Sequence, residues 1–136
     1  MARATHPRAL RRTAPAVPAS VGDLRRAAAR HLQAAGVPGP VVEAVELAVS
    51  EAVTNVVLHA YPAGADPGPV HLTVEAGGAA VTVRVADEGA GIAPRLASPG
   101  AGLGLPIMTN VATTLEMSQG TRAGTELLMT FRAAAS

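Results

Sequence analysis

Residues 50–61 read Ser-Glu-Ala-Val-Thr-Asn-Val-Val-Leu-His-Ala-Tyr and close an amphipathic helical pattern. The helix is predicted to begin at Pro40, which suits a first helical position, and to end at about His59, before Tyr61-Pro62. Its predicted buried stripe consists of Val42, Val45, Val49, Ala52, Val53 and Val56. The pattern therefore predicts a long helix that packs against a core through one face.

The polar face of this helix carries three side chains with useful chemistry. Glu51, Asn55 and His59 are four residues apart, so they share one face opposite much of the valine stripe. A carboxylate and a carboxamide one turn apart can activate a hydroxyl group and supply an oxygen ligand to Mg²⁺. A solvated polar face explains the same spacing, and for this helix taken alone it is the favoured interpretation.

The chain before this helix is predicted to contain one more helix. Ser20 followed by Asp23 indicates a capping box for a helix over residues 21–35, which ends at Gly36. Residues 1–18 are rich in Arg, Ala and Pro, and they are predicted to form a tail or an edge strand.

The chain after the long helix is predicted to form two hairpins. Apolar and polar residues alternate over 70–75 and 81–85, around Gly77-Gly78. Two further strands are expected at 115–118 and 125–131, after a short helix at 107–113. The order of elements predicts an α/β two-layer sandwich of the α+β class, with helices on one face of a largely antiparallel sheet.

Composition excludes several classes of protein. The 136 residues suffice for one domain, and no apolar run is long enough to span a membrane. No signal peptide is recognisable, so a cytoplasmic location is expected. A net charge of +1 with one Tyr and one Phe argues against direct nucleic-acid binding. The chain has no Cys, and all eleven cationic residues are Arg, so thiol chemistry and a lysine-dependent phosphate loop are excluded.

Two glycine-containing segments could bind parts of a nucleotide. Asp87-Glu88-Gly89-Ala90-Gly91 follows a predicted strand, where an Asp can accept the amino group of adenine and glycines allow a tight turn. Residues 100–107 bring three glycines to the start of a helix, where exposed N–H groups bind anions. Each segment alone is also typical of an ordinary surface loop.

The order and spacing of these segments, with Gly124-Thr125 at the start of the last strand, resemble the nucleotide-binding boxes of the GHKL (Bergerat-fold) ATPase superfamily. Residues 46–61 look most like the anti-sigma-factor serine/threonine kinases of that superfamily. The resemblance covers about residues 14–132. It implies an ATP-binding kinase domain at 14–133, preceded by a flexible basic tail at 1–13.

The resemblance also implies a role for each matching residue. Glu51 would be the general base and Asn55 the Mg²⁺ ligand, whereas His59 could lie near the nucleotide or merely close the helix. Asp87 would recognise adenine, supported by Thr125. Residues expected to shape the base pocket or contact the phosphates are Gly89, Gly91, Gly102, Leu103, Gly104 and Leu105.

The activity implied is transfer of phosphate from Mg-ATP to a serine of an anti-anti-sigma (STAS-domain) partner, together with sequestration of a sigma factor by a homodimer. The short segment Ile92 to Pro99 is consistent with the short lid of these kinases, and residues 92–101 are expected to be mobile without ligand. Two alternatives stay open. One is a catalytically silent, ATP-dependent binding module, and the other is a detached histidine-kinase catalytic domain.

Overall fold

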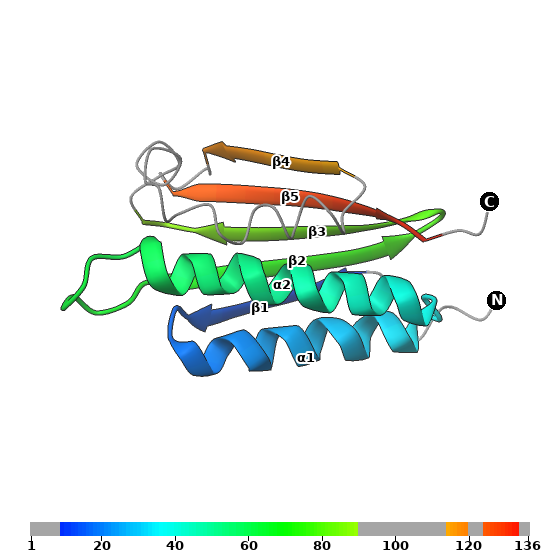
Figure 1. Ribbon diagram of the computed structural model, residues 1–136, viewed down its shortest axis with the longest axis horizontal. Coiled ribbons are helices and arrows are strands. Elements are labelled where there is room, and N and C mark those ends of the chain that lie inside the picture. The colour runs from blue at the N-terminus through cyan, green and yellow to red at the C-terminus, as the bar shows by residue number, and fades with distance from the viewer. Residues whose placement is uncertain (1–8, 90–113, 120–123, 134–136) are drawn as a thin grey trace.

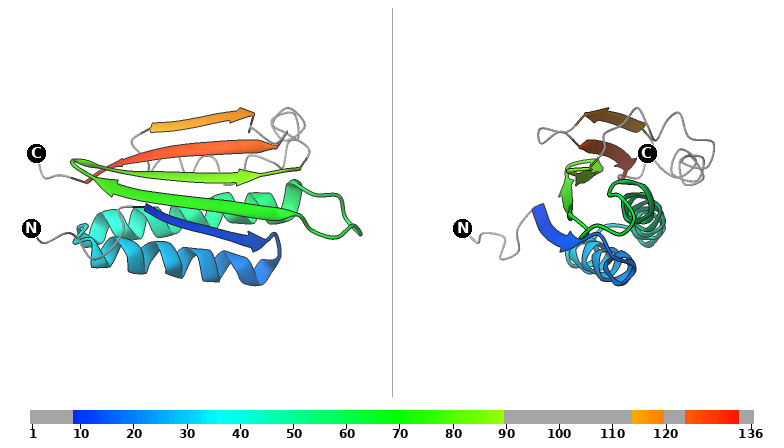
Figure 2. Two further views of the ribbon diagram at one scale, coloured as in Figure 1. Left: turned by 180° about the vertical axis from the view of Figure 1, so that it is seen from behind. Right: turned by 90° about the vertical axis from the view of Figure 1, so that its left-hand side faces the viewer.

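The computed structural model describes residues 9–89, 114–119 and 124–133. Two helices lie side by side over one face of a five-stranded sheet, and the edge-on view of Figure 2 separates the two layers (Figures 1 and 2). The strand order is β1-β2-β3-β5-β4, and all neighbours are antiparallel. The elements are β1 (Ala9–Pro15), α1 (Pro18–Ala34), α2 (Gly39–His59), β2 (Pro69–Gly77), β3 (Ala80–Asp87), β4 (Thr114–Gln119) and β5 (Thr125–Arg132). The predicted two-layer α/β sandwich is therefore confirmed.

Helix α2 follows its prediction closely. It spans Gly39–His59, and its buried residues include the whole predicted valine stripe together with Ala48. Full burial of a valine side chain contributes roughly 1.5–3 kcal/mol, so this stripe is a large part of the stabilisation of the helix.

Helix α1 begins earlier than predicted. It spans Pro18–Ala34, because the fixed φ of proline suits the first turn of a helix. Ser20 therefore lies inside the helix, and its hydroxyl donates to the Pro15 carbonyl oxygen at 2.6 Å instead of capping the helix. The predicted capping box is wrong. The stop at Gly36 is confirmed, since this residue has a φ of +79°.

The sheet buries alternate residues of its central strands. Val70, Leu72 and Val74 of β2 face the helices, and β3 and β5 continue the same alternation. Gly78 turns the β2–β3 hairpin with a φ of +59°, which glycine adopts without strain. Both predicted hairpin strands are present, as are the two C-terminal strands. The predicted short helix at 107–113 lies outside the described residues.

The edge-strand alternative for the N-terminal segment is confirmed, so residues 9–13 do not belong to the expected flexible tail at residues 1–13. Residues 9–13 belong to β1, which pairs with β2 and packs Leu10 and Ala14 against the core. Proline is tolerated here because β1 is an edge strand. Among the residues described, no helix combines the length and the apolar character needed to cross a membrane.

Candidate nucleotide-binding site

Asp87 is the last residue of β3 and is only 3% exposed. Continuing the antiparallel register of β3 and β5 places it opposite Thr125, which is equally buried. Its Oδ1 accepts the backbone N–H of Gly89 at 2.9 Å and that of Thr125 at 3.3 Å. Because two N–H groups from different segments fix the same oxygen, the carboxylate is held in a defined orientation at the end of the sheet. Thr125 thus contacts the Asp87 carboxylate through its backbone N–H, and its support of the adenine contact stays a prediction.

Two glycines permit the close packing around Asp87. A Cβ atom at Gly124 would overlap the backbone carbonyl oxygen of Asp87, and one at Gly89 would overlap the carbonyl oxygen of Ala60. Gly124 thus lets the start of β5 approach β3, and Gly89 lets the loop after β3 approach the end of α2. Gly89 was predicted to shape a base pocket through its turn. Its contact with Ala60 is an additional constraint.

A hydrogen-bond network that sequence reasoning missed holds Glu88. The Tyr61 hydroxyl accepts the Glu88 backbone N–H at 2.8 Å and donates to the Pro69 carbonyl oxygen at 2.6 Å. The Glu88 carboxylate lies 2.8 Å from Nε2 of His71. Tyr61 belongs to the segment that was singled out, but its contacts depend on loop closure over residues 62–68. Tyr61 therefore links the end of α2 to the residues that follow Asp87.

Helix α2 brings the predicted polar face to the same end of the sheet. Glu51, Asn55 and His59 are all half-buried, and α2 packs against both β3 and β5. Asn55 precedes Ala60, the contact of Gly89, by five residues, or about 7.5 Å along the helix axis. His59 is the last residue of the helix. The C-terminal end of α2, which carries Asn55 and His59, thus lies beside the loop that follows Asp87, with Glu51 one turn nearer the start of the helix.

The chemistry of these side chains suits a magnesium nucleotide. No group of three or more His, Cys, Asp or Glu side chains that could hold a metal occurs within residues 9–89, 114–119 and 124–133. Mg²⁺ bound with a nucleotide needs only one or two protein oxygens, because phosphates and water supply the other ligands. The amide oxygen of Asn55 fits that requirement. The remaining predicted contacts, Gly91, Gly102, Leu103, Gly104 and Leu105, lie outside the described residues, as does the predicted lid.

Fold and site together define a class: a two-layer α/β domain with an acceptor carboxylate at the end of the sheet and a polar helix face beside it. Residues 14–131 match the family described as the histidine kinase-like ATPase domain, and the chain belongs to that family. Membership of this family implies that the domain binds ATP. A search of proteins with curated functions finds no match.

Solved structures share the fold at low sequence identity. The structure of the RsbU and RsbW domains of Rv1364c from Mycobacterium tuberculosis aligns with a TM-score of 0.73 and 21% identity, over 94% of this chain and 33% of that one. A histidine kinase domain from the Erythrobacter litoralis blue-light-activated kinase EL346 aligns with a TM-score of 0.58 and 23% identity, over 88% of this chain and 61% of that one. The mycobacterial sensor histidine kinase MprB aligns with a TM-score of 0.51 and 18% identity, over 93% of this chain and 100% of that one. The chain thus spans less than two thirds of the first two, and the likeness is one of fold.

Proposed function

We propose that this protein binds Mg-ATP, transfers the γ-phosphoryl group to a serine of an anti-anti-sigma partner with a STAS domain, and sequesters a sigma factor. The observation that carries the proposal is the joint placement of a buried, fixed carboxylate and a half-buried helix face bearing Glu51 and Asn55. Membership of the histidine kinase-like ATPase family supports the nucleotide. The residues around Glu51 and Asn55, which resemble those of anti-sigma-factor kinases, support the choice of serine.

Each residue then has a separable task. Asp87 accepts the amino group of adenine, because its carboxylate is buried at the end of the sheet and is held in a defined orientation by the N–H groups of Gly89 and Thr125. Gly89 and Gly124 keep Asp87 and its loop close to α2 and β5. Asn55 holds Mg²⁺, which neutralises phosphate charge when bound. Gly102 and Gly104 are proposed to give backbone N–H groups to the phosphates.

Glu51 acts on the attacking group. The serine oxygen of the partner forms a bond to the γ-phosphorus while the bond from that phosphorus to the β,γ-bridging oxygen breaks, which leaves ADP. The serine proton passes to the Glu51 carboxylate. Phosphoryl transfer depends mainly on positioning and charge neutralisation, so one base and one metal ligand beside a bound nucleotide are a sufficient set of groups.

The direct test is incubation with γ-labelled ATP, Mg²⁺ and a purified STAS-domain protein encoded near this one. The proposal predicts acid-stable label on one serine of the partner, located by phosphosite mapping. Sedimentation of the same protein tests the expected homodimer. Label that never reaches the partner, although ATP binds, would favour the catalytically silent binding module.

A histidine-kinase catalytic domain is the second candidate. The family name and the fold likeness to two histidine kinases favour it. Phosphohistidine is lost in acid and phosphoserine is not. Acid-labile label on a histidine of a partner would therefore support this candidate over the serine kinase.

A further inference from the structure

The outer edge of β1 presents backbone groups for pairing. Strand β1 lies at the end of the sheet and pairs with β2 on its inner side (Figure 1). The Ala16 N–H donates to the Gly68 carbonyl oxygen at 3.0 Å, which makes this a hydrogen-bonded pair. Because such pairs alternate along an antiparallel ladder, Arg12 and Leu10 also face β2 with their backbone groups. The N–H and C=O groups of Arg11 and Thr13 therefore point to the outer edge.

A side chain already uses one of these outward groups. Nη1 of Arg12 lies 3.2 Å from the Arg11 carbonyl oxygen and donates to it. This contact agrees with the outward direction deduced from the ladder. It is an exposed interaction, so an incoming strand can replace it at low cost.

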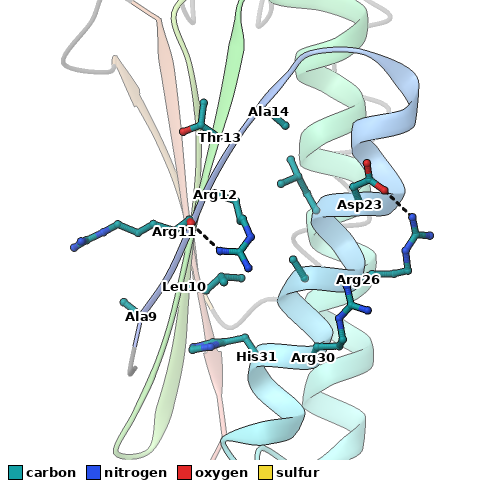
Figure 3. A pocket seen from close by; sticks show the side chains of 12 residues that line it. Ala9, Leu10, Arg11, Arg12, Thr13, Ala14, Asp23, Arg26, Arg30 and His31 are labelled. Atoms are coloured by element: carbon teal, nitrogen blue, oxygen red, sulfur yellow. Dashed lines mark hydrogen bonds and ion pairs between the residues drawn. The ribbon is translucent and has the colours of Figure 1, made fainter. Parts of the chain in front are cut away.

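A groove runs between this edge and α1. Its volume is about 660 Å³, and Leu10, Leu24 and Ala27 give it an apolar lining. Figure 3 shows Arg12 directed toward α1, whereas Arg11 extends from the opposite side of the strand. The edge thus offers an apolar groove beneath it and an arginine on each face of the strand.

Positive charge predominates in this region. Helix α1 adds Arg30 and His31 to the groove. Asp23 is the only acidic residue among the described residues that line the groove, and it pairs with Arg26 at 2.8 Å. An occupant of the edge therefore meets the positive charges of Arg12 and Arg30 on one face of the strand and of Arg11 on the other.

We propose that an extended acidic segment of a partner protein adds to β1 as a sixth strand, with acidic side chains facing Arg11, Arg12 and Arg30. Addition of a strand to a sheet edge gives affinity through main-chain hydrogen bonds and specificity through alternate side chains. A second copy of the chain is a poorer occupant, because pairing of two β1 edges would place Arg11 and Arg12 of both copies along one seam. The chain's own residues 1–8 contain Arg3 and Arg8 and no acidic residue, so they do not fit either.

This surface is separate from the candidate nucleotide site, which lies at the end of β3 and β5. The proposal therefore does not rest on kinase activity, and either can fail without the other. Arginine is also a common protection of sheet edges against aggregation. That simpler role predicts no selective binding of acidic strands, so the two interpretations are separable.

The experiment measures binding of the full chain to a fluorescein-labelled, capped octapeptide of sequence TEEVEEVT, which places glutamates on both faces of a strand. The peptide TKKVKKVT is the charge control. Fluorescence anisotropy gives the affinity, and amide exchange reports on residues 9–15. We expect the glutamate peptide alone to bind and to slow exchange at Arg11 and Thr13.

A matched pair of Thr13 variants separates strand addition from simple charge attraction, and a two-arginine variant measures the contribution of charge. Thr13→Pro removes an outward N–H and should weaken binding at least about tenfold, since proline at a sheet edge blocks pairing on that side only. Thr13→Val is its matched control, because both variants lose the Thr13 hydroxyl contact with His71, 3.0 Å away, while valine keeps the N–H. The two-arginine variant, with Arg12→Gln and Arg30→Gln together, keeps the backbone groups of β1 and should weaken peptide binding about threefold to tenfold.

The outcomes are decisive in both directions. Selective glutamate-peptide binding that Thr13→Pro weakens, but Thr13→Val does not, supports the proposal. Far-UV circular dichroism shows whether Thr13→Pro is folded. If it is not, amide exchange decides: slower exchange at Arg11 and Thr13 of the parent chain on binding of the glutamate peptide supports the proposal, and unchanged exchange there overturns it. The proposal is overturned if both peptides bind equally, or if neither binds at millimolar concentration. It is also overturned if the two Thr13 variants both fold and bind the peptide equally, or if the chain self-associates through an edge that Thr13→Pro abolishes.

Discussion

Replacing Asp87 with asparagine should convert the adenine contact from attractive to repulsive while the loop stays in place. The variant's amide oxygen can still accept the two N–H groups of Gly89 and Thr125, which lie 2.9 and 3.3 Å from Oδ1. Its NH₂ group replaces the second carboxylate oxygen and meets the amino group of adenine, donor against donor. A hydrogen bond to a charged group contributes about 1.5–3 kcal/mol, so the Kd for ATP should rise about 10- to 150-fold.

Isothermal calorimetry with ATP and GTP measures this effect and its selectivity. Guanine carries a carbonyl oxygen where adenine has its amino group, so Asp87→Asn should lose ATP affinity and improve GTP affinity relative to ATP. Glu88→Gln is the matched control, because it removes the same charge one residue further on, and it should change the ATP affinity by no more than about twofold. Equal ATP and GTP affinity in the parent protein, unchanged in a folded Asp87→Asn variant, would refute the reasoning.

Three further variants test the packing around the site and the outer face of α2. Gly124→Ala drives a Cβ into the Asp87 carbonyl oxygen and should lower the free energy of unfolding by about 1–3 kcal/mol. Gly39→Ala is the control, because its Cβ enters open space and should lower the free energy of unfolding by less than about 1 kcal/mol. Equal denaturation midpoints for the two variants would contradict this. Tyr61→Phe removes the hydroxyl that bridges Glu88 and Pro69, so amide exchange at Glu88 should accelerate about fivefold or more. Unchanged exchange would show that the bridge is dispensable. Leu58 is 65% exposed and lies two turns from Glu51 on the same face of α2. Leu58→Ser should therefore raise the KM for the protein partner about fivefold without changing ATP affinity. A lowered ATP affinity instead would place Leu58 at the nucleotide.

Periodicity was sufficient for the elements that pack through a regular face. Helix α2 and strands β2, β3 and β5 follow the predicted spacing, because buried apolar residues repeat at helical or alternating positions. Asp87 could be named from the sequence as a candidate site residue, since an acidic residue at the end of an apolar strand is conspicuous. Its burial and its fixed orientation agree with a binding role, although its ligand remains a prediction.

Local sequence patterns did not suffice where the structure of a segment depends on long-range contacts or on the geometry of proline. Pro18 starts α1, so the capping role predicted for Ser20 does not arise. Local sequence left residues 9–13 as either a tail or an edge strand, and pairing with β2 decides for the strand. Tyr61 and Gly124 make their contacts with segments about 27 and 37 residues away in the chain, and no short window of sequence contains both partners.

The central claim is that Glu51 serves chemistry and Asn55 serves binding. Nucleotide affinity and partner phosphorylation should be measured side by side for Glu51→Gln and Asn55→Ala. Glu51→Gln should keep ATP affinity nearly intact and slow transfer roughly 10²- to 10⁴-fold, as removal of a general base does. Asn55→Ala should lower Mg-dependent ATP affinity and transfer together, because a metal ligand is lost. Transfer at the parent rate by Glu51→Gln would contradict the account, and the protein would then be better explained as an ATP-gated binding module.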